Sequence, residues 1–65
     1  MMASHLHGLS AKTQAAKRER DDRRHDFGQA VALFKGDPSD ANGVRLGKAA
    51  KAYQEAHRRA SLLLR

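Results

Sequence analysis

The chain has 65 residues, no cysteine, and 13 lysines and arginines against 7 acidic residues, which gives a formal net charge of +6. A chain of this length forms one small domain at most and buries little of its surface on its own. Because cysteine is absent, neither a disulfide nor a thiolate metal site can stabilise it, so a second chain is the expected source of stability. No apolar run approaches the ~20 residues that cross a bilayer, which excludes a membrane-spanning protein.

The amino-terminal residues contain the fewest sequence features that predict secondary structure. Residues 1–9 are expected to form a flexible segment ahead of a helical hairpin over residues 10–65. Residues 1–18 contain lysine, arginine and serine but no acid, which is also the composition of an organelle-targeting peptide. Whether residues 1–18 act in targeting is left open. A secretory signal peptide is not expected, because the first residues lack an apolar central region.

A first helix is predicted over residues 10–35, with Ser10 as its N-cap. It contains the segment KRERDDRRHD at residues 17–26, in which every residue except a histidine is formally charged. Opposite charges recur at a spacing of four, as in Glu19 and Arg23, and such pairs stabilise a helix by about 0.2 to 0.5 kcal/mol each. This spacing favours a helix over a disordered tether.

Two arginines are expected on the apolar side of this helix. Phe27 and Phe34 lie seven residues apart and mark the apolar stripe, which reaches Arg20 and Arg23 when it is followed backwards. Buried cations need partners. The candidates are the ring of Tyr53 through a cation–π contact, an acid of another subunit, or a nucleic-acid phosphate.

A short turn over residues 36–37 is predicted to join the first helix to a second helix over residues 38–63. Asp37 is placed to cap this second helix, and Pro38 suits its first position, where a missing N–H costs no hydrogen bond. The pair Asn42-Gly43 is also a turn signal and marks a competing start. In either case the chain reverses direction here.

The second helix is amphipathic, with alanines and leucines at intervals of three and four residues; His57 is expected inside this stripe as a partly buried side chain. The predicted fold is all-α: a two-helix antiparallel hairpin with coiled-coil-like packing that self-associates into a helical bundle. The residues expected at the protein interface are Phe27, Val31, Phe34, Leu46, Ala49, Tyr53, Ala56, Ala60, Leu63 and Leu64.

The opposite helical faces are basic. A strongly basic small domain attracts polyanions, and guanidinium groups suit phosphate because they bind it in a bidentate manner. Aromatic residues are scarce and occupy core-like positions, which disfavours recognition by base stacking. The residues expected to contact nucleic acid are Arg20, Arg23, Arg24, Arg45, Lys48, Lys51, Arg58 and Arg59.

Catalysis is not expected. The sequence contains no nucleophile, base and acid set and no phosphate-binding loop, and His5 and His7 lack further metal ligands nearby. We therefore expect no enzyme activity, no cofactor and no metal. A cytoplasmic location is also expected.

The leading functional hypothesis is a non-enzymatic helical protein that contacts nucleic acid or a ribonucleoprotein through its arginine and lysine faces. The alternative is a protein-interaction subunit, an inhibitor or adaptor, that docks its alanine and leucine stripe on a larger protein. Affinity that falls steeply with salt would favour the first hypothesis.

Overall fold

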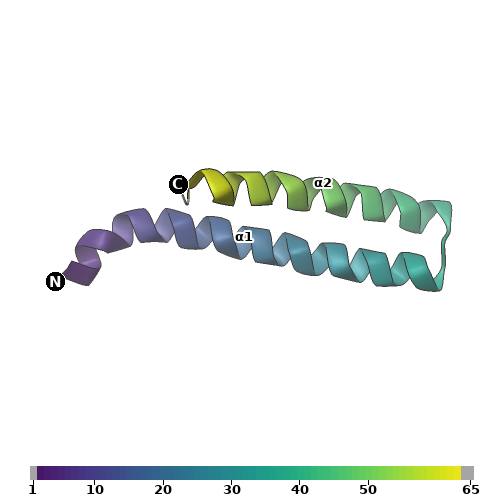
Figure 1. The fold of residues 1–65 in the computed structure, drawn as a ribbon. Helices are drawn as coiled ribbons and strands as arrows, with labels where there is room; N and C mark the ends of the chain where they lie inside the picture. Colours follow the sequence, from purple (N-terminus) through teal and green to yellow (C-terminus); the bar gives the residue numbers. More distant parts are fainter. Residues whose placement is uncertain (1, 64–65) are drawn as a thin grey trace.

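The protein is a hairpin of two α-helices. The computed structural model describes the backbone of residues 2–63 and the side chains of residues 11–63, with α1 at Met2–Gly36 and α2 at Asp40–Leu63. The helices run antiparallel, lie side by side and are joined at one end by a short connection (Figure 1). The described residues contain no strand. The predicted all-α, two-helix antiparallel hairpin is therefore confirmed.

The first helix begins earlier than the sequence indicated. α1 starts at Met2 instead of Ser10, so residues 2–9, where a flexible segment was expected, are helical. Gly8 is the single strong helix-weakening residue in this stretch, and it costs only about 1 kcal/mol relative to alanine. The other residues permit a helix, so α1 continues through this glycine.

The end of α1 is set by proline rather than by a glycine cap. The last residue of α1 is Gly36, but no glycine in the described part of the chain has a positive φ angle, so Gly36 does not form a left-handed cap. The backbone N–H of Asp37 still donates to the Leu33 carbonyl at 2.9 Å. Pro38 has no N–H to continue this series, and the helix ends.

The start of α2 is capped by Ser39 and not by Asp37. The Ser39 Oγ accepts a hydrogen bond from the backbone N–H of Asn42 at 3.2 Å, which is the usual geometry of an N-cap. The Gly43 N–H donates to the Ser39 carbonyl at 2.9 Å. The Asn-Gly pair therefore lies inside the first turn of α2, where a competing turn was considered.

Asn42 also joins the two helices. Its side-chain Nδ2 donates to the Asp37 carbonyl at 2.8 Å and to the Leu33 carbonyl at 3.5 Å. Carbonyls in the last turn of a helix lack partners within the helix. The Leu33 carbonyl also accepts from the Asp37 N–H, and the Asp37 carbonyl from the Ser39 N–H, so Asn42 adds a second donor to each and ties the start of α2 to the end of α1.

The core between the helices consists of small side chains. Ala16, Ala30, Ala56 and Ala60 are each 7% exposed or less, and no large side chain among the described residues is fully buried. Alanines at the contact allow two helix axes to approach closely. Near the turn, a Cβ atom added at Gly43 would lie 3.4 Å from Phe34 Cε1, so glycine brings α2 close to this ring.

Two glycines weaken the helices without serving the packing. A Cβ atom added at Gly28 or Gly47 would meet nothing within 4 Å, and both residues have ordinary helical φ angles. Each replacement by alanine is expected to raise the free energy of unfolding by about 1 kcal/mol, measured by urea unfolding followed by circular dichroism. Gly43→Ala is the comparison, because its Cβ touches Phe34. An unchanged or lower stability for Gly47→Ala would contradict the described path of α2.

Candidate nucleic-acid interface

Some cations predicted to contact nucleic acid already have acidic partners in the same chain. The ion pairs are Arg20 with Asp21 at 3.4 Å, Arg23 with Asp26 at 3.7 Å, and Arg59 with Glu19. All three lie at the surface, where an ion pair contributes little to stability. Each acid nevertheless offsets the positive charge beside it, so these arginines are weaker candidates for holding phosphate.

The remaining predicted cations are exposed and form no ion pair with the residues whose side chains are described: Arg24, Arg45, Lys48, Lys51 and Arg58. Four of them belong to α2, whose two acids are Asp40 at its start and Glu55. Both helices therefore have a formal net charge of +3, and α2 differs in having two acids against the four of α1.

Three of these side chains share one side of α2. At about 100° per residue, Lys51 and Arg58 project on the side opposite the buried Ala56 and Ala60, and Lys48 lies at the edge of that side, about 80° from both Ala56 and Arg58. They span about 15 Å along the helix axis. We call this set, Lys48, Lys51 and Arg58, the basic face. Duplex DNA carries about one charge per 1.7 Å of its axis, so several phosphates lie within this span.

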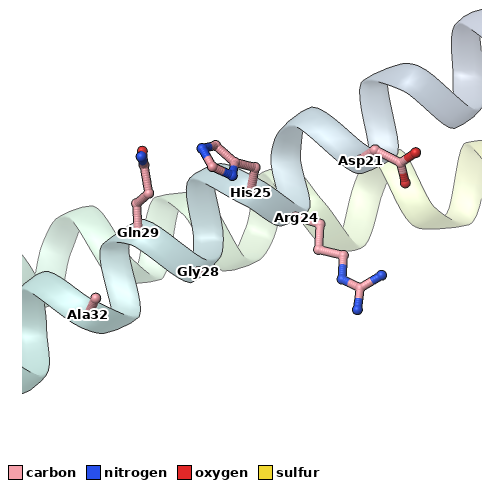
Figure 2. Close-up of a pocket in the computed structure, with 6 residues that line it drawn as sticks. All are labelled: Asp21, Arg24, His25, Gly28, Gln29 and Ala32. Carbon is pink, nitrogen blue, oxygen red and sulfur yellow. The ribbon is translucent and has the colours of Figure 1, made fainter.

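Arg24 does not belong to the basic face. It lines a shallow groove on α1 with Asp21, His25, Gly28, Gln29 and Ala32, and its guanidinium projects away from the helix (Figure 2). All the lining residues come from one helix, so this groove is a concave stretch of the surface and not an enclosed pocket. The structure therefore does not gather all the predicted cations into one patch.

The two arginines expected on the apolar side are only partly covered. The Arg20 side chain is 27% exposed and the Arg23 side chain is 48% exposed, so neither lies fully in the apolar seam. Nor does either supply a cation–π partner for Tyr53. Tyr53 instead stacks on Phe27, with ring centroids 6.0 Å apart and an angle of 13° between the rings. The seam is filled by a ring and by alanine, so the guanidinium groups turn outwards to acids on their own helix.

His57 is also placed differently from the prediction. It is exposed and lies at the edge of the stripe, with its ring 6.0 Å from that of Tyr53 and tilted by 53°. Because Ala56 and Ala60 are the buried members of this stripe, the neighbouring histidine faces solvent. A partly buried histidine in the core is therefore excluded.

The residues predicted at a protein interface differ in how deeply they are buried within the hairpin. Ala56 and Ala60 are buried against α1 within the same chain. Leu63 is 44% exposed, so α1 does not cover the leucine end of the stripe, and Leu64 lies outside the described residues. The others are half-buried: Phe27, Val31, Phe34, Leu46, Ala49 and Tyr53.

A polar groove between the helices was not expected from the sequence. Glu19, Arg23, Ala52, Glu55, Ala56 and Arg59 line it, and the Glu19–Arg59 ion pair crosses it from α1 to α2. The two residues of this pair are 40 positions apart. Helical spacing identifies partners only within one helix, so this contact becomes visible only when the register between the helices is known.

The described part of the chain gives no sign of a metal or membrane site. Residues with described side chains include no group of three or more histidines and acids that could hold a metal ion. Within the same described part, neither helix has a stretch apolar and long enough to cross a bilayer.

Comparisons with protein-family models, with curated proteins and with solved structures each found no match. The function therefore has to follow from the hairpin and its surface alone.

Proposed function

We propose that the protein is a small non-enzymatic binding protein that holds the phosphate backbone of nucleic acid, free or in a ribonucleoprotein, against the basic face of α2. The observation that supports this most is that Lys48, Lys51 and Arg58 are exposed, free of ion pairs to the described side chains, and on one side of one helix. Lysine and arginine that neutralise phosphates release bound counterions, which favours binding.

The proposed contacts are to the backbone and not to the bases. Phe27 and Tyr53 are half-buried and stack on each other, so each ring has at most one face left for a base. The Asn42 side chain is occupied at the turn. Phosphate contacts position a protein but carry little sequence information. We therefore favour a duplex bound without strong sequence preference over a single strand bound by stacking.

Salt dependence tests this function directly. Fluorescence anisotropy of a labelled DNA or RNA duplex should give an affinity that falls with a slope of about −2.7 in log K against log salt for the three contacts of the basic face. A slope steeper than this would indicate that Arg24 or Arg45 also takes part. Absence of binding at low salt, or an affinity independent of salt, would refute the proposal.

One observation favours a second function, that of a protein-interaction subunit. Leu62 is 58% exposed and Leu63 is 44% exposed at the open end of the hairpin. Exposed leucines at a helix end suit a groove in a larger protein. The salt titration separates the two functions, because a complex held by apolar burial persists as salt rises.

A further inference from the structure

The last turns of α2 contain a serine shortly after two arginines. Arg58 and Arg59 stand three and two residues before Ser61, in the sequence HRRASLLL at residues 57–64. Protein kinases select their substrates by the charges around the reacting hydroxyl. Acidic side chains beside a kinase cleft can bind both guanidinium groups and so hold the serine at the reacting phosphate. Residues 58–62 therefore have the charge pattern of a substrate for an arginine-directed serine kinase.

No other serine or threonine of the chain has this pattern. Ser4, Ser10, Thr13 and Ser39 lack a lysine or arginine two or three residues before them. Ser39 also has a structural role, because it is half-buried and its Oγ accepts the hydrogen bond that caps α2. The sequence thus distinguishes Ser61 from the other hydroxyl residues, and Ser39 serves as an internal comparison.

Ser61 is exposed and lies two residues before the end of α2. A serine within a helix enters an enzyme cleft only when its turn opens. Opening here uncovers Ala60, which is 1% exposed, and breaks the surface ion pair between Glu19 and Arg59, which contributes little to stability. Leu62 is already 58% exposed, so little further apolar surface is uncovered. Access to Ser61 therefore requires only a small local opening.

A phosphate on Ser61 would change the basic face. At about 100° per residue, the Ser61 and Arg58 side chains project about 60° apart and one turn from each other. Arg58 is exposed and has no ion pair with a described side chain. A phosphoserine carries about −1.5 to −2 charges and three acceptor oxygens, which a guanidinium binds in a bidentate manner. The modified residue would thus give Arg58 an anionic partner, as Glu19 already does for Arg59.

We infer that Ser61 is a phosphorylation site for an arginine-directed serine kinase, and that its phosphate pairs with Arg58 and weakens nucleic-acid binding by the basic face. In the reaction the Ser61 Oγ forms a bond to the γ-phosphorus of ATP, and the bond from that phosphorus to the β–γ bridging oxygen breaks. ADP leaves, and the hydroxyl proton passes to a base of the kinase. The modification depends on the local sequence and exposure alone, whereas its effect on binding rests on the proposed function.

Mass spectrometry of the intact protein tests the modification. The full chain is incubated with magnesium-ATP and the catalytic subunit of cAMP-dependent protein kinase, which serves as the arginine-directed probe. The chain should gain one phosphoryl group, located at Ser61 by fragmentation, and Ser61→Ala should gain none. Arg59→Gln should slow the reaction about tenfold or more, because one charge-assisted contact to the kinase is lost.

Lys48→Gln is the matched control for the loss of charge. It removes one cation from α2 outside residues 58–62, so this variant should react at the rate of the natural chain. Arg59→Gln also removes the ion pair to Glu19, so a slower reaction cannot be attributed to a more closed helix end. An unmodified natural chain, modification at Ser39 instead, or a natural rate for Arg59→Gln would overturn the inference.

Duplex binding tests the effect of the phosphate. Fluorescence anisotropy should show that phosphorylation weakens affinity about tenfold near physiological salt and flattens the slope of log K against log salt by about 0.9, the contribution of one phosphate contact. Phosphatase treatment should restore the natural affinity. Equal affinity of the two forms would refute the regulation. If neither form binds a duplex, the proposed function fails together with this regulation, while the mass measurement still decides whether Ser61 is modified.

Discussion

Replacing Lys48, Lys51 and Arg58 together by glutamine is expected to weaken duplex binding about a hundredfold near physiological salt, because three phosphate contacts and their counterion release are lost. The salt dependence should flatten by about 2.7 in the slope of log K against log salt. These side chains are exposed and make no ion pair with described residues, so the hairpin should fold normally. Anisotropy titrations at several salt concentrations measure both effects.

The matched control removes the same amount of charge elsewhere. Arg20, Arg23 and Arg59 are each offset by an acid, so replacing these three by glutamine should weaken binding less than about tenfold. Circular dichroism of both triple variants excludes unfolding as the cause. If the two variants lose equal affinity, net charge alone drives binding and the basic face has no special role.

Ala30→Asp is expected to unfold the hairpin. Ala30 is 2% exposed between the two helices, and an unpaired carboxylate placed there loses its water, which costs about 3 kcal/mol or more. A single small core seldom supplies more than ~3 to 5 kcal/mol in total. Thermal and urea unfolding followed by circular dichroism should show a broad transition of separate helices or no folded baseline.

Ala32→Asp provides the comparison for this change. Ala32 lies on the same helix two residues later and is exposed, so aspartate there should cost only its lower helix propensity, roughly 0.7 kcal/mol or less. The difference between the two variants isolates burial from helix propensity. Similar unfolding curves would mean that α1 does not pack through Ala30.

The helices and their antiparallel arrangement were predictable because strong local signals agree. The apolar residues of α2 recur at helical spacing, and Pro38 followed by Ser39 marks the break between the two helices. The N-cap of α2 was predicted at Asp37 and lies at Ser39, because both side chains are good N-caps. Only the observed bond from the Asn42 N–H to Ser39 distinguishes them.

The rotation of each helix was harder to predict. An alanine-rich stripe is wide and weakly apolar, so a small rotation about the axis changes which flanking residues are covered. This is why Arg20, His57 and Leu63 were expected deeper in the seam than they lie. The ion pair between Glu19 and Arg59 depends on the same rotation and on the register between the helices. Which cations lack an ion pair could therefore not be predicted from the sequence.

The closed turn also leads us to expect a particular order in which the hairpin forms. Asn42 meets Leu33 only 9 positions away, whereas Arg59 meets Glu19 across 40 positions. Because the entropy lost on closing a loop grows with its length, contacts beside Asn42 form most readily and each later contact is brought near by the one before. We therefore expect the hairpin to form from its bend, with the end that carries Leu62 and Leu63 the last to pair and the first to open.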